Sequence, residues 1–179
     1  MDGERVKQRS CGGCTVCCHV LPIDTPELRK APGVACTHCG PVGCTIYETR
    51  FPICRTYYCG WHDLPALGPD WRPDRSGVLI SPRNGDAPPG YPEDGIEFLV
   101  LGGEKAVRRK GFAATIAEFV ARGIPIYLAV PGPPKHFSAH VFLNAMLEDT
   151  AVRRDHAAVT ATLIRVLKAA TNHKFESMG

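Results

Sequence analysis

The nine cysteines of this 179-residue chain all lie between Cys11 and Cys59, and the 120 residues after Cys59 contain none. Gly, Pro and Thr fill the gaps between them, and the stretch carries too few large aliphatic side chains to form a hydrophobic core of its own. Another kind of bond must therefore organise it. The cysteines follow the pattern Cys11-x2-Cys14-x2-Cys17-Cys18, then Cys36-x2-Cys39-x4-Cys44-x9-Cys54-x4-Cys59.

The cellular setting bears on what these thiols do. The opening Met1-Asp2-Gly3-Glu4-Arg5 has mixed charges and no apolar run follows it, so we expect no secretory signal and a cytoplasmic location. In a reducing cytosol, dense cysteine arrays serve metals or redox chemistry more often than disulfides. The apolar stretches 96–101 and 124–130 are far shorter than the roughly 20 residues of a membrane helix, so we expect no membrane partner.

Overall composition excludes few other classes. Apolar residues make up 44% of the chain and charged residues 22%, which argues against global disorder. The formal net charge of +3 arises from 21 basic and 18 acidic side chains spread along the chain. This bias is too weak to support nucleic-acid binding.

The cysteine spacing favours metal coordination. A two-residue gap lets both thiolates of a Cys-x-x-Cys turn reach one zinc ion at about 2.3 Å. Cys36-Thr-His-Cys39-Gly40 and Cys11-Gly-Gly-Cys14 both have this form. The run Cys11, Cys14, Cys17 equally matches ferredoxin ligands of iron–sulfur clusters, so spacing leaves the metal open.

Adjacent Cys17 and Cys18 add a constraint. Neighbouring side chains of an extended backbone point to opposite sides, so this pair predicts two metal centres or one bridged cluster. Eight thiolates would fill two four-sulfur sites, and the charges of Arg50 and Arg55 would offset part of their negative charge. Aromatic side chains are expected to shield the site from water, namely Tyr47, Phe51, Tyr57, Tyr58 and Trp61.

Two segments together resemble a known family. They are Cys11-Gly-Gly-Cys14-Thr-Val-Cys17-Cys18 and Gly43-Cys44-Thr-Ile-Tyr47-Glu48-Thr-Arg50-Phe-Pro-Ile-Cys54-Arg55-Thr-Tyr57-Tyr-Cys59. Their order and spacing are similar to the bacterial YkgJ-type cysteine-cluster family, described as a zinc- or iron-chelating domain, over roughly the first third of the chain. Phe51 stands where that family usually has proline, with Pro52 one place later.

The resemblance implies a ligand set. Its eight cysteines map to Cys11, Cys14, Cys17, Cys18, Cys36, Cys44, Cys54 and Cys59. Cys39 is then the extra thiol, although its Cys-x-x-Cys-Gly context suits a ligand. Flagellin lysine methylases carry a similar cysteine segment within a much longer chain, so methyl transfer enters only by analogy.

The sequence gives weaker support to other roles for the cysteines and to histidine ligands. Buried free thiols are the plain alternative to ligands, and nine cysteines at these gaps disfavour it. His19, His38 and His62 lie beside cysteines, yet enough thiols exist without them. His136 and His140 would share one helix face, but no third ligand is evident.

The remaining motifs point to no catalyst. Gly102-Gly103 is interpreted as a turn because the other residues of a phosphate loop are missing. The basic patch Lys105, Arg108, Arg109, Lys110 is interpreted as a solvated loop, with a weak anion site as the alternative. A Gly-x-Ser-x-Gly elbow and the zinc-deaminase pairing are both absent from the sequence. Catalytic residues therefore stay unassigned, and an enzyme is the less favoured class.

The predicted fold is α+β, with a loop-rich cysteine-cluster metal module packed on a small α/β layer. We expect the metal module at 1–62, a Pro/Gly-rich connector with a short strand (77–81) at 63–95, and an α/β part at 96–179. Within it, strands at 96–101 and 124–130 flank a helix containing Phe112 and Val120, which makes the strands parallel. Further helices are predicted at 25–30, 138–148 and 155–170, with Pro26 and Asp155 near two of their starts.

The sequence thus predicts a metal-binding protein with a structural or binding role. Zinc, as two ions, is favoured slightly over an iron–sulfur cluster because of the Cys-x-x-Cys-Gly turn. The alternatives are an iron–sulfur redox or methyl-transfer enzyme and a metal storage or delivery protein. Metal ions are the expected partners, and the sequence identifies no protein partner.

Overall fold

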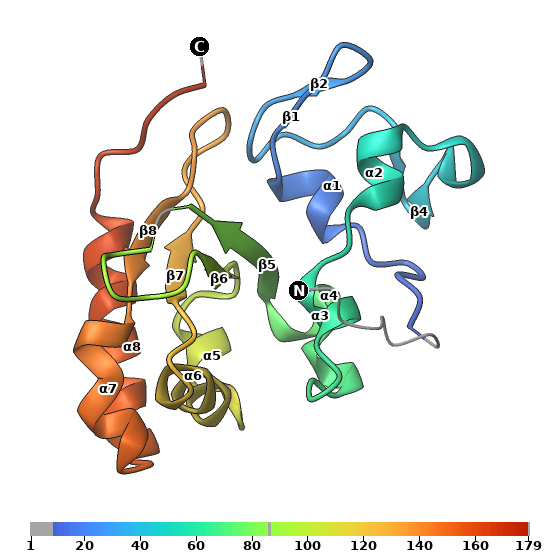
Figure 1. Ribbon diagram of the computed structural model, residues 1–179. Helices are drawn as coiled ribbons and strands as arrows, with labels where there is room; N and C mark the ends of the chain where they lie inside the picture. Colours follow the sequence, from blue (N-terminus) through green and yellow to red (C-terminus); the bar gives the residue numbers. More distant parts are fainter. Residues whose placement is uncertain (1–8, 86, 179) are drawn as a thin grey trace.

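A computed structural model describes residues 9–85 and 87–178 (Figure 1). It contains both helices and a mixed sheet, so the predicted α+β class is confirmed. The opening residues that carry the prediction of no secretory signal lie outside the described residues. None of the described helices is both long enough and apolar enough to cross a membrane.

Within the described residues the main sheet has four strands in the order β5-β6-β7-β8. Their bounds are β5 Val78–Asn84, β6 Asp94–Val100, β7 Ile126–Val130 and β8 Ala139–Phe142. The pairs β5·β6 and β7·β8 are antiparallel, whereas β6 and β7 are parallel. The helices α5 (Gly103–Val107) and α6 (Phe112–Ala121) connect the parallel pair, which confirms the predicted strand–helix–strand unit.

Helices cover one face of this sheet. With α5 and α6, the helices α7 (Asn144–Val152) and α8 (His156–Thr171) pack on alternate strand residues such as Ile80, Phe98 and Leu128. The predicted start of α8 is confirmed, because the Asp155 carboxylate accepts a hydrogen bond from Ala158 N at 3.0 Å.

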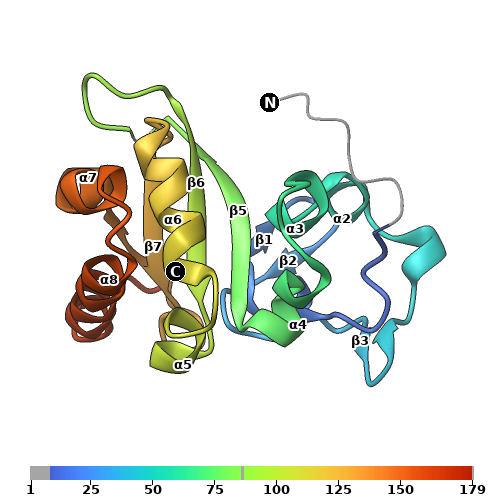
Figure 2. The same cartoon turned by 90° about the horizontal axis from the view of Figure 1, so that it is seen from below.

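The opposite face carries the residues around the cysteines. We call residues 9–59 the cysteine segment; Figure 2 shows most of it on the side of the sheet away from α6, α7 and α8. Its elements are α1 Val16–Val20, β1 Ile23–Asp24, β2 Arg29–Lys30, β3 Cys39–Gly40, β4 Gly43–Cys44, η1 Tyr47–Thr49 and α2 Pro52–Thr56. Val16, Val20 and Leu21 contact a small apolar cluster on this face of the sheet, formed by Leu79, Leu99 and Ala129.

Short elements join the cysteine segment to β5. They are α3 Gly60–Asp63, η2 Pro69–Trp71 and α4 Pro73–Ser76. Trp71 stacks on Phe112 with ring centroids 5.8 Å apart, so this part belongs to the main core. The predicted short strand at 77–81 is longer than expected, because β5 runs on through Pro82 to Asn84. Proline is tolerated there because β5 is an edge strand.

Two predicted helices are wrong or too long. Residues 25–30 form the turn and second strand of a β1–β2 hairpin, in which Ile23 pairs with Lys30. Residues 139–142 form β8, and α7 begins only at Asn144. In both places the segment is too short for periodicity to separate strand from helix, and strand pairing decides. His136 and His140 therefore do not share a helix face. The boundaries predicted after residues 62 and 95 stay predictions.

Candidate metal-binding site

All nine cysteines are free thiols, and each is half-buried. They are carried by short elements and turns, with Cys17 and Cys18 in α1, Cys54 in α2 and Cys59 just before α3. Local backbone geometry can bring together only the two cysteines of a Cys-x-x-Cys turn. The other cysteines are distant in sequence, so the fold of the segment determines which of them are neighbours. Electrostatic interactions divide the thiols into two neighbouring groups, which are linked by the Cys17–Cys18 hydrogen bond and by an interaction between Cys11 and Cys18.

The first group consists of Cys11, Cys14, Cys17 and Cys59. Cys14 N donates to the Cys11 carbonyl at 2.9 Å, which closes the first Cys-x-x-Cys turn. Cys17 and Cys59 each interact electrostatically with Cys11 and Cys14, the two thiols of that turn. Cys17 also interacts with Cys59. The group therefore brings Cys59 to residues far away in the sequence.

The second group consists of Cys18, Cys36, Cys39, Cys44 and Cys54. Cys39 N donates to the Cys36 carbonyl at 2.9 Å, and Cys36 N donates to the Cys18 carbonyl at 2.9 Å. Cys39 lies opposite Cys44 in the β3–β4 pair, so their side chains share one face of that hairpin. Cys54 interacts electrostatically with Cys18, Cys36 and Cys44.

The two groups adjoin at Cys17 and Cys18. The prediction for this pair assumed extended backbone and is wrong in that respect, because both residues lie in α1. A hydrogen bond between their sulfurs lowers the pKa of Cys17 and raises that of Cys18. Within the part of the chain that the structure describes, no three Cys, His, Asp or Glu side chains converge closely enough to hold a metal ion.

Burial raises the pKa of five of these thiols and so favours their protonated form. It raises the pKa of Cys59 to about 11, although the N–H groups of Trp61 and His62 act in the opposite direction. Burial likewise raises the pKa of Cys11, Cys14, Cys39 and Cys54. A cation bound by these sulfurs would have to displace their protons.

Basic side chains surround both groups. Lys30, only 5% exposed, interacts with Cys36, Cys18, Cys17 and Cys39, and its Nζ donates to the Val34 carbonyl at 2.7 Å. Arg50, one of the predicted counter-charges, acts on Cys11 and Cys54. Arg72 acts on Cys14 and donates to the Asp74 carboxylate. Arg55, the other predicted counter-charge, is exposed on α2.

The three nearby histidines differ in position. His62 Nε2 lies 3.3 Å from Cys11 Sγ, and His19 Nε2 lies 3.4 Å from Cys39 Sγ. The His38 ring instead packs against Phe51. Among the predicted shielding aromatics, Trp61 is buried, whereas Tyr47 is 44% exposed and lies under Arg50.

The cysteines are evident from the sequence, but two of their polar neighbours are not. A lone lysine such as Lys30 gives no signal of burial in the sequence. The Arg72–Asp74 ion pair next to Cys14 was missed because it lies in the predicted connector. Comparison of the chain with protein-family models, with characterised proteins and with solved structures gave no match. The similarity to the YkgJ-type family therefore stays a sequence-based prediction.

Proposed function

We propose that this protein binds two metal ions, or a cluster of similar charge, through two sets of four cysteine thiolates. The first set is Cys11, Cys14, Cys17 and Cys59, and the second is Cys18, Cys36, Cys44 and Cys54. Zinc is the favoured metal, with a role in holding the cysteine segment folded. Cys39 is the ninth thiol and is not required.

The grouping of the thiols is the observation that carries this proposal. In each set a backbone hydrogen bond links two of the cysteines: Cys14 N donates to the Cys11 carbonyl, and Cys36 N donates to the Cys18 carbonyl. In this assignment the neighbours Cys17 and Cys18 belong to different sets, and the hydrogen bond between their sulfurs places the two sets next to each other. Structural zinc sites are most often closed and four-coordinate.

Two further features support the proposal. Between residues 9 and 59, all described, only Lys30 and Pro32 are buried, so hydrophobic burial contributes little to holding this segment. Burying an ammonium group is costly unless negative charge lies close by. Metal-bound thiolates would supply that charge to Lys30, whereas protonated thiols would not.

Metal analysis of single variants tests the assignment. We expect native mass spectrometry of the reduced protein to show about two zinc ions. Cys14→Ser in the first set and Cys36→Ser in the second should each lose about one ion, because a three-sulfur site binds zinc more weakly. Cys39→Ser is the matched control and should keep both. Equal zinc content in all four proteins would contradict the proposal.

An iron–sulfur cluster is the second candidate, and the closed Cys11–Cys14 turn followed by Cys17 favours it. Elemental analysis and an absorption spectrum of one anaerobic sample separate the two metals. A colourless protein that contains zinc supports the first candidate. Iron with equimolar acid-labile sulfide and broad visible absorption supports the second, and with it the redox class of function.

A further inference from the structure

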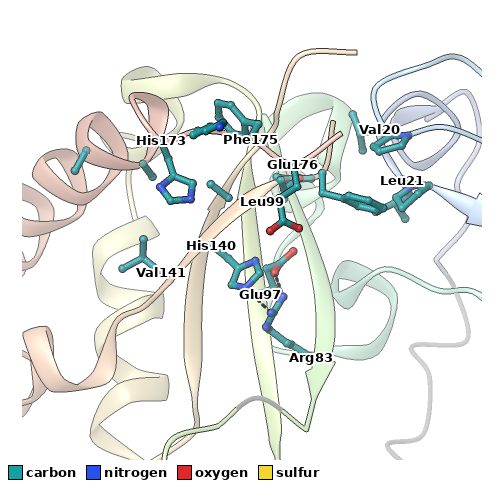
Figure 3. A pocket seen from close by; sticks show the side chains of 18 residues that line it. Val20, Leu21, Arg83, Glu97, Leu99, His140, Val141, His173, Phe175 and Glu176 are labelled. Atoms are coloured by element: carbon teal, nitrogen blue, oxygen red, sulfur yellow. Dashed lines mark hydrogen bonds and ion pairs between the residues drawn. The ribbon is translucent and has the colours of Figure 1, made fainter. Parts of the chain in front are cut away.

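A cavity of about 820 Å³ lies away from the thiols (Figure 3). It is an open cavity, lined by the sheet, by residues 20–22 of the cysteine segment and by the C-terminal residues that follow α8. Small-molecule sites typically have volumes of roughly 300–1,000 Å³. No cysteine is among the described residues that line it, so the cavity is distinct from the proposed metal site.

Three polar side chains, from strands β5, β6 and β8, form a hydrogen-bonded unit in this cavity. Arg83 Nη1 donates to Glu97 Oε2 at 2.7 Å, and Arg83 Nη2 donates to His140 Nε2 at 2.7 Å. A guanidinium group can only donate, so His140 accepts at Nε2 and its ring proton is on Nδ1. The guanidinium also lies over the Tyr127 ring, 4.9 Å from its centroid. The unit is therefore held in place before any ligand arrives.

The C-terminal residues add one charge of each sign. Lys174 and Glu176 both line the cavity, and neither forms an ion pair with another described residue. Two backbone hydrogen bonds position this stretch, from Phe137 N to the Glu176 carbonyl at 2.9 Å and from Met178 N to the Lys135 carbonyl at 2.8 Å. In Figure 3 the Glu176 side chain points toward the part of the cavity where Glu97 and His140 lie.

Apolar side chains form much of the remaining wall, which also includes Ser138 and His173. Val20 and Leu21 approach from the cysteine segment, Leu99 from β6 and Phe175 from the C-terminal stretch. The cavity thus combines an apolar wall with two carboxylates and two cationic groups. A ligand of single charge would match one pair and be repelled by the other.

We propose that this cavity binds a zwitterionic molecule with an apolar side chain, an apolar α-amino acid or a short peptide of such residues. Its ammonium group would face Glu97 and Glu176, and its carboxylate would face Lys174 and the Nδ1–H of His140. Its side chain would cover Leu21 and Leu99. The cavity volume leaves room for more than one amino-acid residue, so the experiment compares a free amino acid with a dipeptide.

Calorimetric titration of the full-length, metal-loaded protein tests this with a matched series. The probes are L-leucine and L-leucyl-L-leucine, both zwitterions, together with leucinamide (cation), N-acetylleucine (anion) and N-acetylleucinamide (neutral). We expect at least one zwitterion to bind about tenfold more tightly than the three derivatives, because each derivative leaves one charged group of the cavity unmatched. Tighter binding of leucine would identify a free amino acid as the ligand, and tighter binding of leucyl-leucine would identify a peptide.

Three surface variants locate the binding. Glu176→Gln and Lys174→Gln should each weaken the preferred zwitterion about tenfold, since both side chains are exposed and their loss should leave folding intact. Glu118→Gln on α6 is the control, because neither Glu118 nor its partner Arg122 lines the cavity. Binding of N-acetylleucinamide as tight as leucine, equal weakening in the control, or no heat from either zwitterion at about 10 mM would each overturn the proposal.

Discussion

Lys30 is the one charged residue that the cysteine segment buries. Burial lowers its pKa, and the surrounding cysteines, Cys36 foremost, act to raise it if they are ionised. Its Nζ also donates to the carbonyls of His19, Ala31 and Val34, so the ammonium is hydrogen-bonded although no carboxylate ion pair holds it among the described residues. Metal-bound thiolates would make this position favourable for a cation.

The variant Lys30→Met should affect the metal-free and the metal-loaded protein differently. Met keeps the aliphatic stem and removes the charge, so the metal-free protein should lose little stability. The metal-loaded protein should bind zinc roughly 10–100-fold more weakly, because a neighbouring charge that stabilises the thiolates is gone. Competition with a coloured chelator measures the affinity. Lys110→Met, at an exposed position, is the control. Unchanged zinc affinity would show that Lys30 does not serve the thiolates.

At the scale of elements, α3 approaches β5 closely where Gly60 meets Ile80. A Cβ atom on Gly60 would lie 2.5 Å from Ile80 Cγ2, and Ile80 is buried in the main core. We expect Gly60→Ala to destabilise the fold by about 1–3 kcal/mol, since the core must shift to make room. Urea unfolding measures this. Gly13→Ala is the matched control, because open space surrounds that position and its φ is negative or extended. An equal loss of unfolding free energy in the two variants would show that the core accommodates a methyl group at Gly60.

The helices α5 and α8 are linked through Glu104, which pairs with Arg108 at 2.7 Å and with Lys168 at 3.6 Å. The hydrogen bond from Arg108, with a smaller effect of Lys168, lowers the pKa of Glu104. A carboxylate with a lowered folded-state pKa stabilises the fold above its unfolded pKa, and this contribution disappears as pH falls through the folded value.

Glu104→Gln should therefore be slightly less stable than the parent protein at about pH 6, and the difference should close by about pH 3. Urea unfolding at both pH values measures it. Glu148→Gln, at an exposed position of α7, is the control for the removal of a surface carboxylate. A difference that persists unchanged at the lower pH would mean that lost packing, rather than lost charge, is responsible.

How far sequence predicts these elements depends on their length. The strand–helix–strand unit and α8 were predicted because their apolar periodicity extends over many residues, and Asp155 marks the start of α8. The hairpin of β1 and β2 and the edge strand β8 were missed, because each is at most four residues long and is defined by its pairing partner. Local pattern carries no information about such partners.

The same holds for the candidate site. All nine cysteines were evident from spacing, and the closed turns at Cys11–Cys14 and Cys36–Cys39 agree with it. Their division into two groups could not be predicted, because Cys59 joins the first group only through the path of the chain across α2. The cavity was likewise unpredictable, since Arg83, His140 and Glu176 come from a strand, another strand and the C-terminal stretch.

The whole molecule is a layered structure in which the sheet separates two parts held by different forces (Figure 2). The helical side has a large apolar core, whereas the cysteine segment touches the sheet through the small cluster at Leu79, Leu99 and Ala129. Leu21 belongs to both the contact with this cluster and the wall of the cavity. The folding of the cysteine segment therefore contributes to the shape of the cavity. The polar unit of the cavity, Arg83, Glu97 and His140, lies on strands of the sheet.

If metal replaces a core in the cysteine segment, its removal should unfold that segment and spare the rest. We expect a strong chelator, added under reducing conditions, to abolish amide hydrogen-exchange protection across residues 9–59. Protection in β6, β7 and α6 should remain, because those elements are held by buried side chains such as Phe98 and Ile116. Exchange measured by mass spectrometry resolves the two regions, and adding zinc back should restore the first. Undiminished protection at 9–59 after complete metal removal would mean that the contacts of this segment with the sheet suffice to hold it, and that its thiols are not its structural bonds.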